Sequence, residues 1–166
     1  MIRSILVVCI GNICRSPMAE AMLASALPGC IVQSAGVGAL VGAQADPIAR
    51  ELMREKGFDI ECHRARQLLR SHCMHADLVL VMGTEQKRHV ERLNPLSRGR
   101  VFRMGEFGDV DIRDPFRGGR DAFVSALGSI ERGVSEWSKR IASSGPRTME
   151  AESQQALAQL EVRGDR

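Results

Sequence analysis

An apolar run that ends at a cysteine constrains this chain more than any other feature. The run Ile5-Leu6-Val7-Val8 is typical of a buried strand, and Cys9 follows it directly. Arg15 and Ser16 then precede Pro17, which suits the first turn of a helix because its missing N–H costs nothing there. The pattern therefore predicts a strand, a tight loop and the N-terminus of a helix in direct succession.

The loop between this strand and this helix is expected to bind an anion. Backbone N–H groups and the positive end of a helix dipole converge at such a point. A cysteine placed there is expected to be a thiolate near neutral pH, so Cys9 is a candidate nucleophile. Arg15 adds a planar fork that can hold two phosphate oxygens. These residue types together favour attack of the thiolate on phosphorus, followed by hydrolysis of the phosphorylated cysteine.

Strand-like and helical segments alternate along the chain. Strands are expected near residues 4–9, 31–35, 78–81 and 101–104, and helices near 16–27, 47–56, 84–93 and 120–142. This alternation predicts an α/β fold, a three-layer sandwich in which helices cover both faces of a parallel sheet. Parallel sheets bind ligands beyond the carboxyl ends of their strands, and Cys9 lies at such an end.

Length and composition fit one domain. A chain of 166 residues, 44% hydrophobic and 26% charged, is ordinary for a globular protein. We expect a domain over residues 1–143 and a flexible or weakly helical tail over 144–166, where large apolar residues become rare. The net charge of +3 is too small to indicate nucleic-acid binding.

The cysteines and the absence of long apolar stretches bear on location. Five scattered cysteines without an export signal predict a cytoplasmic protein with free thiols. No stretch approaches the roughly 20 apolar residues of a membrane span, so we expect no membrane insertion.

Phosphoryl transfer also needs a general acid for the leaving oxygen. Asp114 is the preferred candidate over Asp109 and Asp111, because Pro115 follows it and stiffens the loop. Phe116 comes next as a possible wall for a ring. Within the first loop, Ser16 is placed to donate a hydrogen bond to the sulfur of Cys9, and Asn12 to hold a strained turn.

The loop resembles the signature of a known family, the low-molecular-weight protein tyrosine phosphatases, on the residues Cys9-Ile10-Gly11-Asn12-Ile13-Cys14-Arg15-Ser16-Pro17. The resemblance covers about residues 3–142 and includes Ser34-Ala35-Gly36, His63 and Asp114-Pro115. It implies a four-stranded parallel sheet, hydrolysis of phosphotyrosine through a cysteinyl-phosphate, and neither a metal nor another cofactor.

The same resemblance implies a role for each site residue. Cys9 is the nucleophile, Arg15 binds phosphate and stabilises the transition state, and Asp114 is the acid. Asn12 and His63 support the loop. Contacts to the bound phosphate or its ring are implied for Ile10, Gly11, Asn12, Ile13, Cys14, Ser16, Leu40 and Phe116.

A narrower resemblance involves the loop after the second strand. The stretch from Ser34 to Gly42 is similar to the bacterial branch encoded with capsule and exopolysaccharide machinery. Members of that branch act on the tyrosine-rich tail of an autophosphorylating tyrosine kinase. The resemblance therefore implies such a kinase as partner, and we expect a monomer or a weak homodimer.

Several alternatives remain open from the sequence. An arsenate reductase on the same scaffold needs relay cysteines near residues 80–90, but the last cysteine is Cys73. A non-catalytic phosphotyrosine-binding module would lack the nucleophile, the arginine or the acid, and all three are present. Cys14 is either a small buried residue or a thiol that forms a reversible disulfide with Cys9, the pairing that the family resemblance favours.

Overall fold

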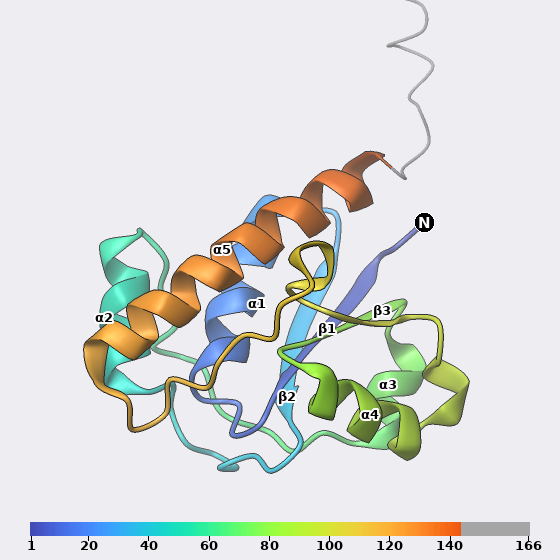
Figure 1. Cartoon of the computed structure of the whole chain (residues 1–166), viewed down its shortest axis with the longest axis horizontal. Coiled ribbons are helices and arrows are strands. Elements are labelled where there is room, and N and C mark those ends of the chain that lie inside the picture. The colour runs from blue at the N-terminus through green and yellow to red at the C-terminus, as the bar shows by residue number, and fades with distance from the viewer. Residues whose placement is uncertain (144–166) are drawn as a thin grey trace, which may run out of the picture.

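The computed structural model describes residues 1–143, and the predicted tail over 144–166 lies outside them. The chain runs through the elements β1 (Ser4–Cys9), α1 (Arg15–Ala26), β2 (Ile31–Gly36), α2 (Pro47–Glu55), α3 (Arg70–His75), β3 (Leu78–Val81), α4 (Thr84–Leu93), the 3₁₀ turn η1 (Pro95–Ser97), β4 (Val101–Arg103), the 3₁₀ turn η2 (Glu106–Gly108) and α5 (Gly119–Ser143). Figure 1 shows α5 lying lengthwise across the other elements.

The sheet has four parallel strands in the order β2-β1-β3-β4. β1 is therefore central, and its last residue Cys9 pairs with Gly36 at the end of β2. The predicted α/β fold with a four-stranded parallel sheet is confirmed. Its order places the end of β1 between two other strand ends, where a ligand site is expected.

Helices cover both faces of the sheet (Figure 1). Ile5 and Val7 of β1 belong to the core packed with α1, α2 and α5, while Leu6 and Val8 pack toward α3 and α4. The two sets alternate because successive side chains of a strand point to opposite faces. Both sets are buried, which explains why the strand reads as a continuous apolar run.

Local signals placed some elements well and missed others. Asp46 caps α2, since its carboxylate accepts the N–H of Ile48 at 2.9 Å. Thr84 is the first residue of α4, and its N–H and hydroxyl both donate to Asp111. The short helix α3 was not predicted, because only Cys73 of its six residues is buried.

Within residues 1–143, no helix combines the length and the apolar character that crossing a bilayer requires.

Candidate active site

The loop that joins β1 to α1 wraps around the sulfur of Cys9. Cys9 is 2% exposed, and its sulfur accepts the backbone N–H of Asn12 at 3.3 Å. Its sulfur also lies 2.9 Å from the hydroxyl oxygen of Ser16, in the first turn of α1. The geometry thus places a hydrogen-bonded cysteine at the N-terminus of a helix, as the sequence pattern predicted.

Asn12 fixes the shape of this loop. Its φ of 55° is left-handed, which asparagine tolerates better than most residues. Its buried side chain donates to the hydroxyls of Ser16 and Ser34, each at 2.8 Å, and accepts the N–H of Arg66 at 2.9 Å. The three partners of this side chain lie in the first turn of α1, in β2 and in the segment between α2 and α3.

A second set of side chains, His63, Ser34 and Glu20, supports the loop at Asn12. The Nε2 of His63 donates to the carbonyl oxygen of Asn12 at 2.7 Å. The hydroxyl of Ser34 donates to Glu20 at 2.5 Å, and Glu20 in turn lies 4.0 Å from the Nδ1 of His63. The structure thus brings His63 to Asn12, the pair expected to support the loop, and adds Ser34 and Glu20, which had no predicted role.

β2 approaches the loop so closely that only glycine fits at one position. A Cβ on Gly36 would lie 2.3 Å from the carbonyl oxygen of Ile10. The Ser34-Ala35-Gly36 sequence therefore has two structural roles. Ser34 belongs to the hydrogen-bond network, and Gly36 allows close contact between β2 and the loop that joins β1 to α1, called the phosphate loop below.

Arg15 and Asp114 face each other on the open side of the loop. The guanidinium of Arg15, 3% exposed, donates to the carbonyl oxygen of Ile112 at 2.8 Å and to the carboxylate of Asp114 at 2.6 Å. Its Nε is buried and has no hydrogen-bond partner within residues 1–143. A buried donor without a partner is costly, and an oxygen of a bound anion would satisfy it. The carboxylate of Asp114 also accepts the N–H of Phe116 at 3.2 Å.

A cleft of about 290 Å³ opens above these groups. Its lining residues are Cys9, Ile10, Gly11, Ile13, Cys14, Arg15, Gly38, Leu40, Asp114, Phe116 and Arg117. Leu40 and Phe116 are about half exposed and supply apolar surface at its rim. The size and lining suit a phosphate group attached to a planar ring.

The predicted residues separate into two groups. Nine of the predicted residues line the cleft alongside Gly38 and Arg117, which sequence reasoning missed. Asn12, Ser16 and His63 lie behind it. Asp109 and Asp111 are both held by Arg103, away from the cleft. Asp114 is therefore the acidic residue of this loop that reaches the site. The left-handed φ of 63° at Arg117 has no signal in the sequence.

Cys14 shares the cleft with Cys9, and both are free thiols. Burial raises the pKa of the Cys14 thiol well above its usual range, and the nearby Asp46 adds to this shift. Cys14 is therefore a neutral thiol beside a sulfur that accepts hydrogen bonds.

A cysteine whose sulfur contacts a backbone N–H and a hydroxyl, an arginine with a buried unpaired donor and an acidic residue define a cysteine-dependent phosphatase site. The family model described as low molecular weight phosphotyrosine protein phosphatase matches residues 4–147, and the chain belongs to this family. The family and the enzyme class predicted from the sequence, protein-tyrosine-phosphatase, are thus confirmed. The arsenate reductase alternative is not favoured.

Individual relatives agree with this assignment. The chain is 55% identical over 145 residues to the probable low molecular weight protein-tyrosine-phosphatase EpsP of Ralstonia solanacearum, covering 87% of this chain and 100% of EpsP. It resembles the structure of Vibrio vulnificus Wzb in complex with benzylphosphonate, at 39% identity and a TM-score of 0.81, covering 84% and 99% of the two chains. The YwlE arginine phosphatase of Geobacillus stearothermophilus is also similar, at 36% identity and a TM-score of 0.80, covering 85% and 94%.

Proposed function

We propose that this phosphatase hydrolyses phosphotyrosine in proteins through a phosphorylated Cys9. The observation that carries the proposal is the convergence of Cys9, Arg15 and Asp114 on one cleft. Each comes from a different segment, and each has the chemistry that one part of the reaction needs.

In the first step, the thiolate of Cys9 attacks phosphorus and the bond from phosphorus to the tyrosine oxygen breaks. Arg15 binds two phosphate oxygens and stabilises the charge that spreads over them in the transition state. The bound phosphate takes over donors of Arg15 that hold Asp114 in the free enzyme. Asp114, released from Arg15, is protonated from solvent and gives that proton to the leaving tyrosine oxygen.

In the second step, water attacks the phosphorus of the cysteinyl-phosphate. The carboxylate of Asp114 accepts a proton from that water, and the bond from phosphorus to sulfur breaks. Inorganic phosphate leaves and Cys9 returns as a thiolate. The hydroxyl of Ser16, 2.9 Å from the sulfur, stabilises that departing thiolate.

The rim of the cleft supports an aromatic substrate. Leu40 and Phe116 offer apolar surfaces on which a phenyl ring can pack. The similar Wzb structure is described with benzylphosphonate, which carries such a ring. Because a similar structure is described as an arginine phosphatase, the test must separate phosphotyrosine from phosphoarginine as the substrate.

The test compares peptides that carry phosphotyrosine, phosphoarginine or phosphoserine. We expect phosphate release from phosphotyrosine alone, and complete loss of release in the Cys9→Ser variant. Cys62→Ser is the matched control, because Cys62 is an exposed thiol outside the cleft. Preferred hydrolysis of phosphoarginine contradicts the substrate, whereas full activity of Cys9→Ser contradicts the mechanism.

We further propose that the substrate is an autophosphorylated bacterial tyrosine kinase and that its dephosphorylation regulates exopolysaccharide or capsule production. The similarity of residues 34–42 to the bacterial branch supports this assignment. Deleting the gene is expected to change the amount of surface polysaccharide, and the wild-type gene or Cys62→Ser is expected to restore it. Restoration by Cys9→Ser would show that the phosphatase activity has no part in the process.

Cys14 is proposed to protect Cys9 from irreversible oxidation. Peroxide converts the Cys9 thiolate to a sulfenic acid, and the Cys14 thiol then displaces water from it to form a disulfide. Peptide mapping after peroxide treatment is expected to find a Cys9–Cys14 crosslink and recovery of activity with a reducing thiol. In Cys14→Ser the same treatment is expected to be irreversible. Cys9 found as sulfonic acid in the wild type, without the crosslink, contradicts the proposal.

A further inference from the structure

The rim of the cleft carries a basic side chain that the mechanism does not use. Arg117 lines the cleft, is exposed, and directly follows Phe116, which is proposed to pack on the substrate ring. Its guanidinium carbon lies 5.2 Å from the centre of the Phe116 ring. A guanidinium is attracted to the face of an aromatic ring, so this contact keeps the positive charge at the rim.

Arg117 has no acidic partner of its own. No carboxylate within residues 1–143 forms an ion pair with it, whereas Arg120, three residues later, pairs with both Glu51 and Glu55. Among the described residues that line the cleft, Asp114 supplies the one carboxylate, and it pairs with the catalytic arginine. The positive charge at the rim is therefore available to an anion from outside the protein.

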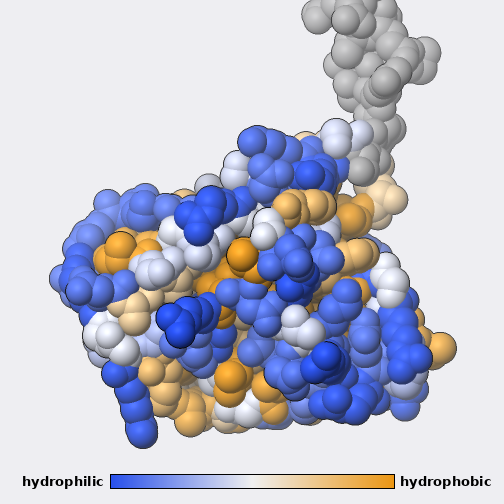
Figure 2. Space-filling model, in the orientation of Figure 1, coloured by the Kyte–Doolittle hydropathy of each residue, from blue (hydrophilic) through white to orange (hydrophobic). Residues whose placement is uncertain are grey.

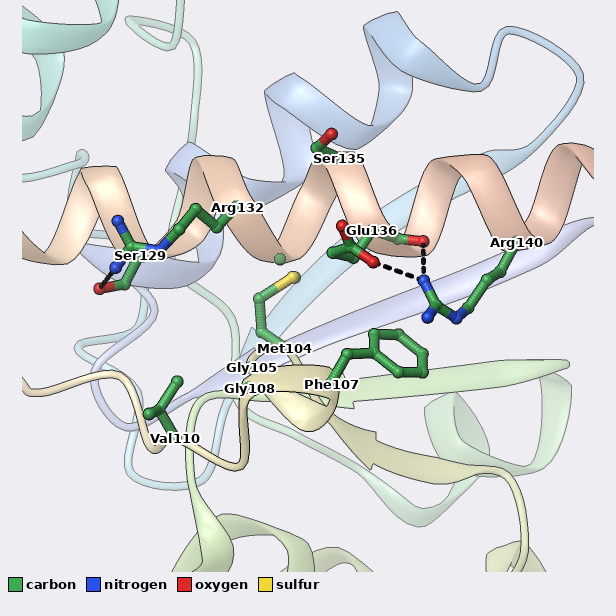
Figure 3. A pocket seen from close by; sticks show the side chains of 11 residues that line it. Met104, Gly105, Phe107, Gly108, Val110, Ser129, Arg132, Ser135, Glu136 and Arg140 are labelled. Atoms are coloured by element: carbon green, nitrogen blue, oxygen red, sulfur yellow. Dashed lines mark hydrogen bonds and ion pairs between the residues drawn. The ribbon is translucent and has the colours of Figure 1, made fainter.

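A larger cavity, of about 480 Å³ between α5 and residues 104–110, shows the opposite arrangement (Figure 3). There Arg140 pairs with Glu136 at 2.6 Å, and Arg132 donates to the hydroxyl of Ser129 at 3.0 Å. Both arginines thus have a partner on their own helix. That cavity gives no reason to expect an anionic ligand, whereas the rim of the cleft does.

The other charged groups at the site are committed to each other or to the reaction. Arg15 holds the phosphate, and Asp114 gives a proton to the leaving oxygen. Asp46, whose charge acts on Cys14, caps the N-terminus of α2. Arg117 is therefore the charged side chain of the rim that is left to contact the peptide beyond its phosphotyrosine.

The rim also offers apolar surface to a peptide. Ile10, Leu40 and Phe116 line the cleft and are between 44% and 50% exposed. The carboxyl ends of β1 and β2 point to the lower edge of Figure 1, where Figure 2 shows hydrophobic surface beside hydrophilic surface. A protein segment can therefore lie across this edge with its phosphotyrosine in the cleft.

We propose that Arg117 selects substrates in which an aspartate or glutamate lies within two residues of the phosphotyrosine. The inference rests on the proposed function, because it concerns the peptide around the same phosphotyrosine. With the phosphate at Arg15 and the ring against Phe116, the peptide backbone lies at the rim. A carboxylate there meets a guanidinium that can hold it through two parallel N–H donors. The ring contact of Arg117 restricts the guanidinium beforehand, which lowers the entropy lost on pairing.

The experiment measures kcat/KM of the full chain for phosphotyrosine peptides that differ at one position. Each of the two residues before and the two residues after the phosphotyrosine is in turn glutamate, glutamine or lysine. All peptides carry the same phosphate, so the ratio between two of them reports on the varied side chain alone. At one position or more, the wild type is expected to favour glutamate over glutamine by about two- to fivefold, the range of an exposed ion pair. The preference should appear mainly in KM and should shrink as salt is added.

Substitutions of Arg117 test the source of the preference. Arg117→Gln is expected to remove it, Arg117→Lys to keep part of it, and Arg117→Glu to favour the lysine peptide instead. Arg113→Gln is the matched control, because Arg113 is exposed on the same segment but does not line the cleft. It is expected to keep the wild-type ratio. The ratio of two peptides within one variant cancels any change in folding or in the chemical steps.

Four results would overturn the inference, and one of them also contradicts the proposed function. A glutamate preference that survives in Arg117→Gln overturns it. An equal loss of preference in Arg113→Gln overturns it as well, because the preference then comes from the overall charge of the protein. Equal kcat/KM of the wild type for all peptides overturns the inference but leaves the proposed function intact. Absence of phosphate release from every phosphotyrosine peptide contradicts the proposed function itself, and the inference fails with it.

Discussion

Two loops meet at the active site, and each contains a non-glycine residue with a left-handed backbone. Asn12 has a φ of 55° in the phosphate loop, and Arg117 a φ of 63° in the loop that follows Asp114. Asn12 is fully buried and its side chain makes three hydrogen bonds. Arg117 is exposed, and its guanidinium lies 5.2 Å from the centre of the Phe116 ring.

The comparison shows that one conformation is fixed by its surroundings, whereas the other is only lightly held. Contacts from Ser16, Ser34 and Arg66 hold Asn12, whose own N–H donates to the sulfur of Cys9. The loop after Asp114 is held by local contacts, namely the turn hydrogen bond from the Gly118 N–H to the Pro115 carbonyl oxygen and a ring contact, and by the ion pair to Arg15. A lightly held loop suits an acid that moves between Arg15 and the leaving oxygen.

The largest effect is expected from removing Asp114, the proton donor in the lightly held loop. Asp114→Asn should lower turnover of phosphotyrosine by about 100-fold or more, in the range of general acid catalysis. Phosphate binding should remain, because Arg15 and the loop N–H groups are unchanged. Steady-state kinetics with a series of aryl phosphates measures the effect.

The leaving groups of that series provide the control. A very acidic phenol leaves without a proton, so its turnover should fall much less in Asp114→Asn. An equal loss for acidic and weakly acidic phenols contradicts the assignment of Asp114 as the acid.

Substitutions of Asn12 test the tightly held loop between β1 and α1. Asn12→Ala removes three buried hydrogen bonds and leaves their partners unsatisfied, which should cost on the order of 3 kcal/mol of unfolding free energy. Asn12→Gly loses the same bonds but accepts the left-handed backbone, so it should retain about 1 kcal/mol more. Urea denaturation of the three proteins measures both differences. If alanine and glycine are equally destabilising, the backbone conformation contributes nothing to the role of Asn12.

A glycine substitution at the left-handed residue of the other loop, Arg117, should have little effect on stability. Arg117→Gly relieves the left-handed strain but makes the unfolded chain more flexible, and these opposing terms should leave stability within about 1 kcal/mol of the wild type. Arg117→Ala keeps the strain and should be the less stable of the two. Thermal melts rank them. A loss at Arg117→Gly as large as that at Asn12→Gly removes the distinction between the loops.

The sequence predicts the first loop far better than the second, for a physical reason. The strand, Cys9, Pro17 and the helix are consecutive, so their arrangement follows from local rules. The polar contacts of Asn12 join residues 12, 34 and 66, and no local pattern reveals such a network. The backbone at Arg117 depends on tertiary contacts as well, and neither residue type nor neighbours marked it.

The role of Asp111, in the segment before the Asp114 loop, was also not predictable from the sequence. Asp111, a rival to Asp114 on sequence grounds, anchors that segment by accepting the N–H of Thr84 at 2.9 Å and by pairing with Arg103. Gly83 leaves the space for it, since a Cβ there would lie 2.9 Å from the carboxylate. Sequence alone offered no reason to prefer anchoring over catalysis for Asp111.

The smallest expected effect tests this anchor through its pH dependence. Burial by itself raises the pKa of Asp111, but the hydrogen bonds from Thr84 and Arg103 outweigh it and lower the pKa below its ordinary value of 3.8. A carboxyl whose pKa is lower in the folded state stabilises the fold above the unfolded pKa, and that contribution disappears as pH falls through the folded pKa. Asp111→Asn should therefore be slightly less stable than the wild type near neutral pH, and the gap should close in acid. The effect is small because the carboxylate is half exposed. A gap that persists below the folded pKa would mean that Asp111 holds the segment by packing rather than by charge.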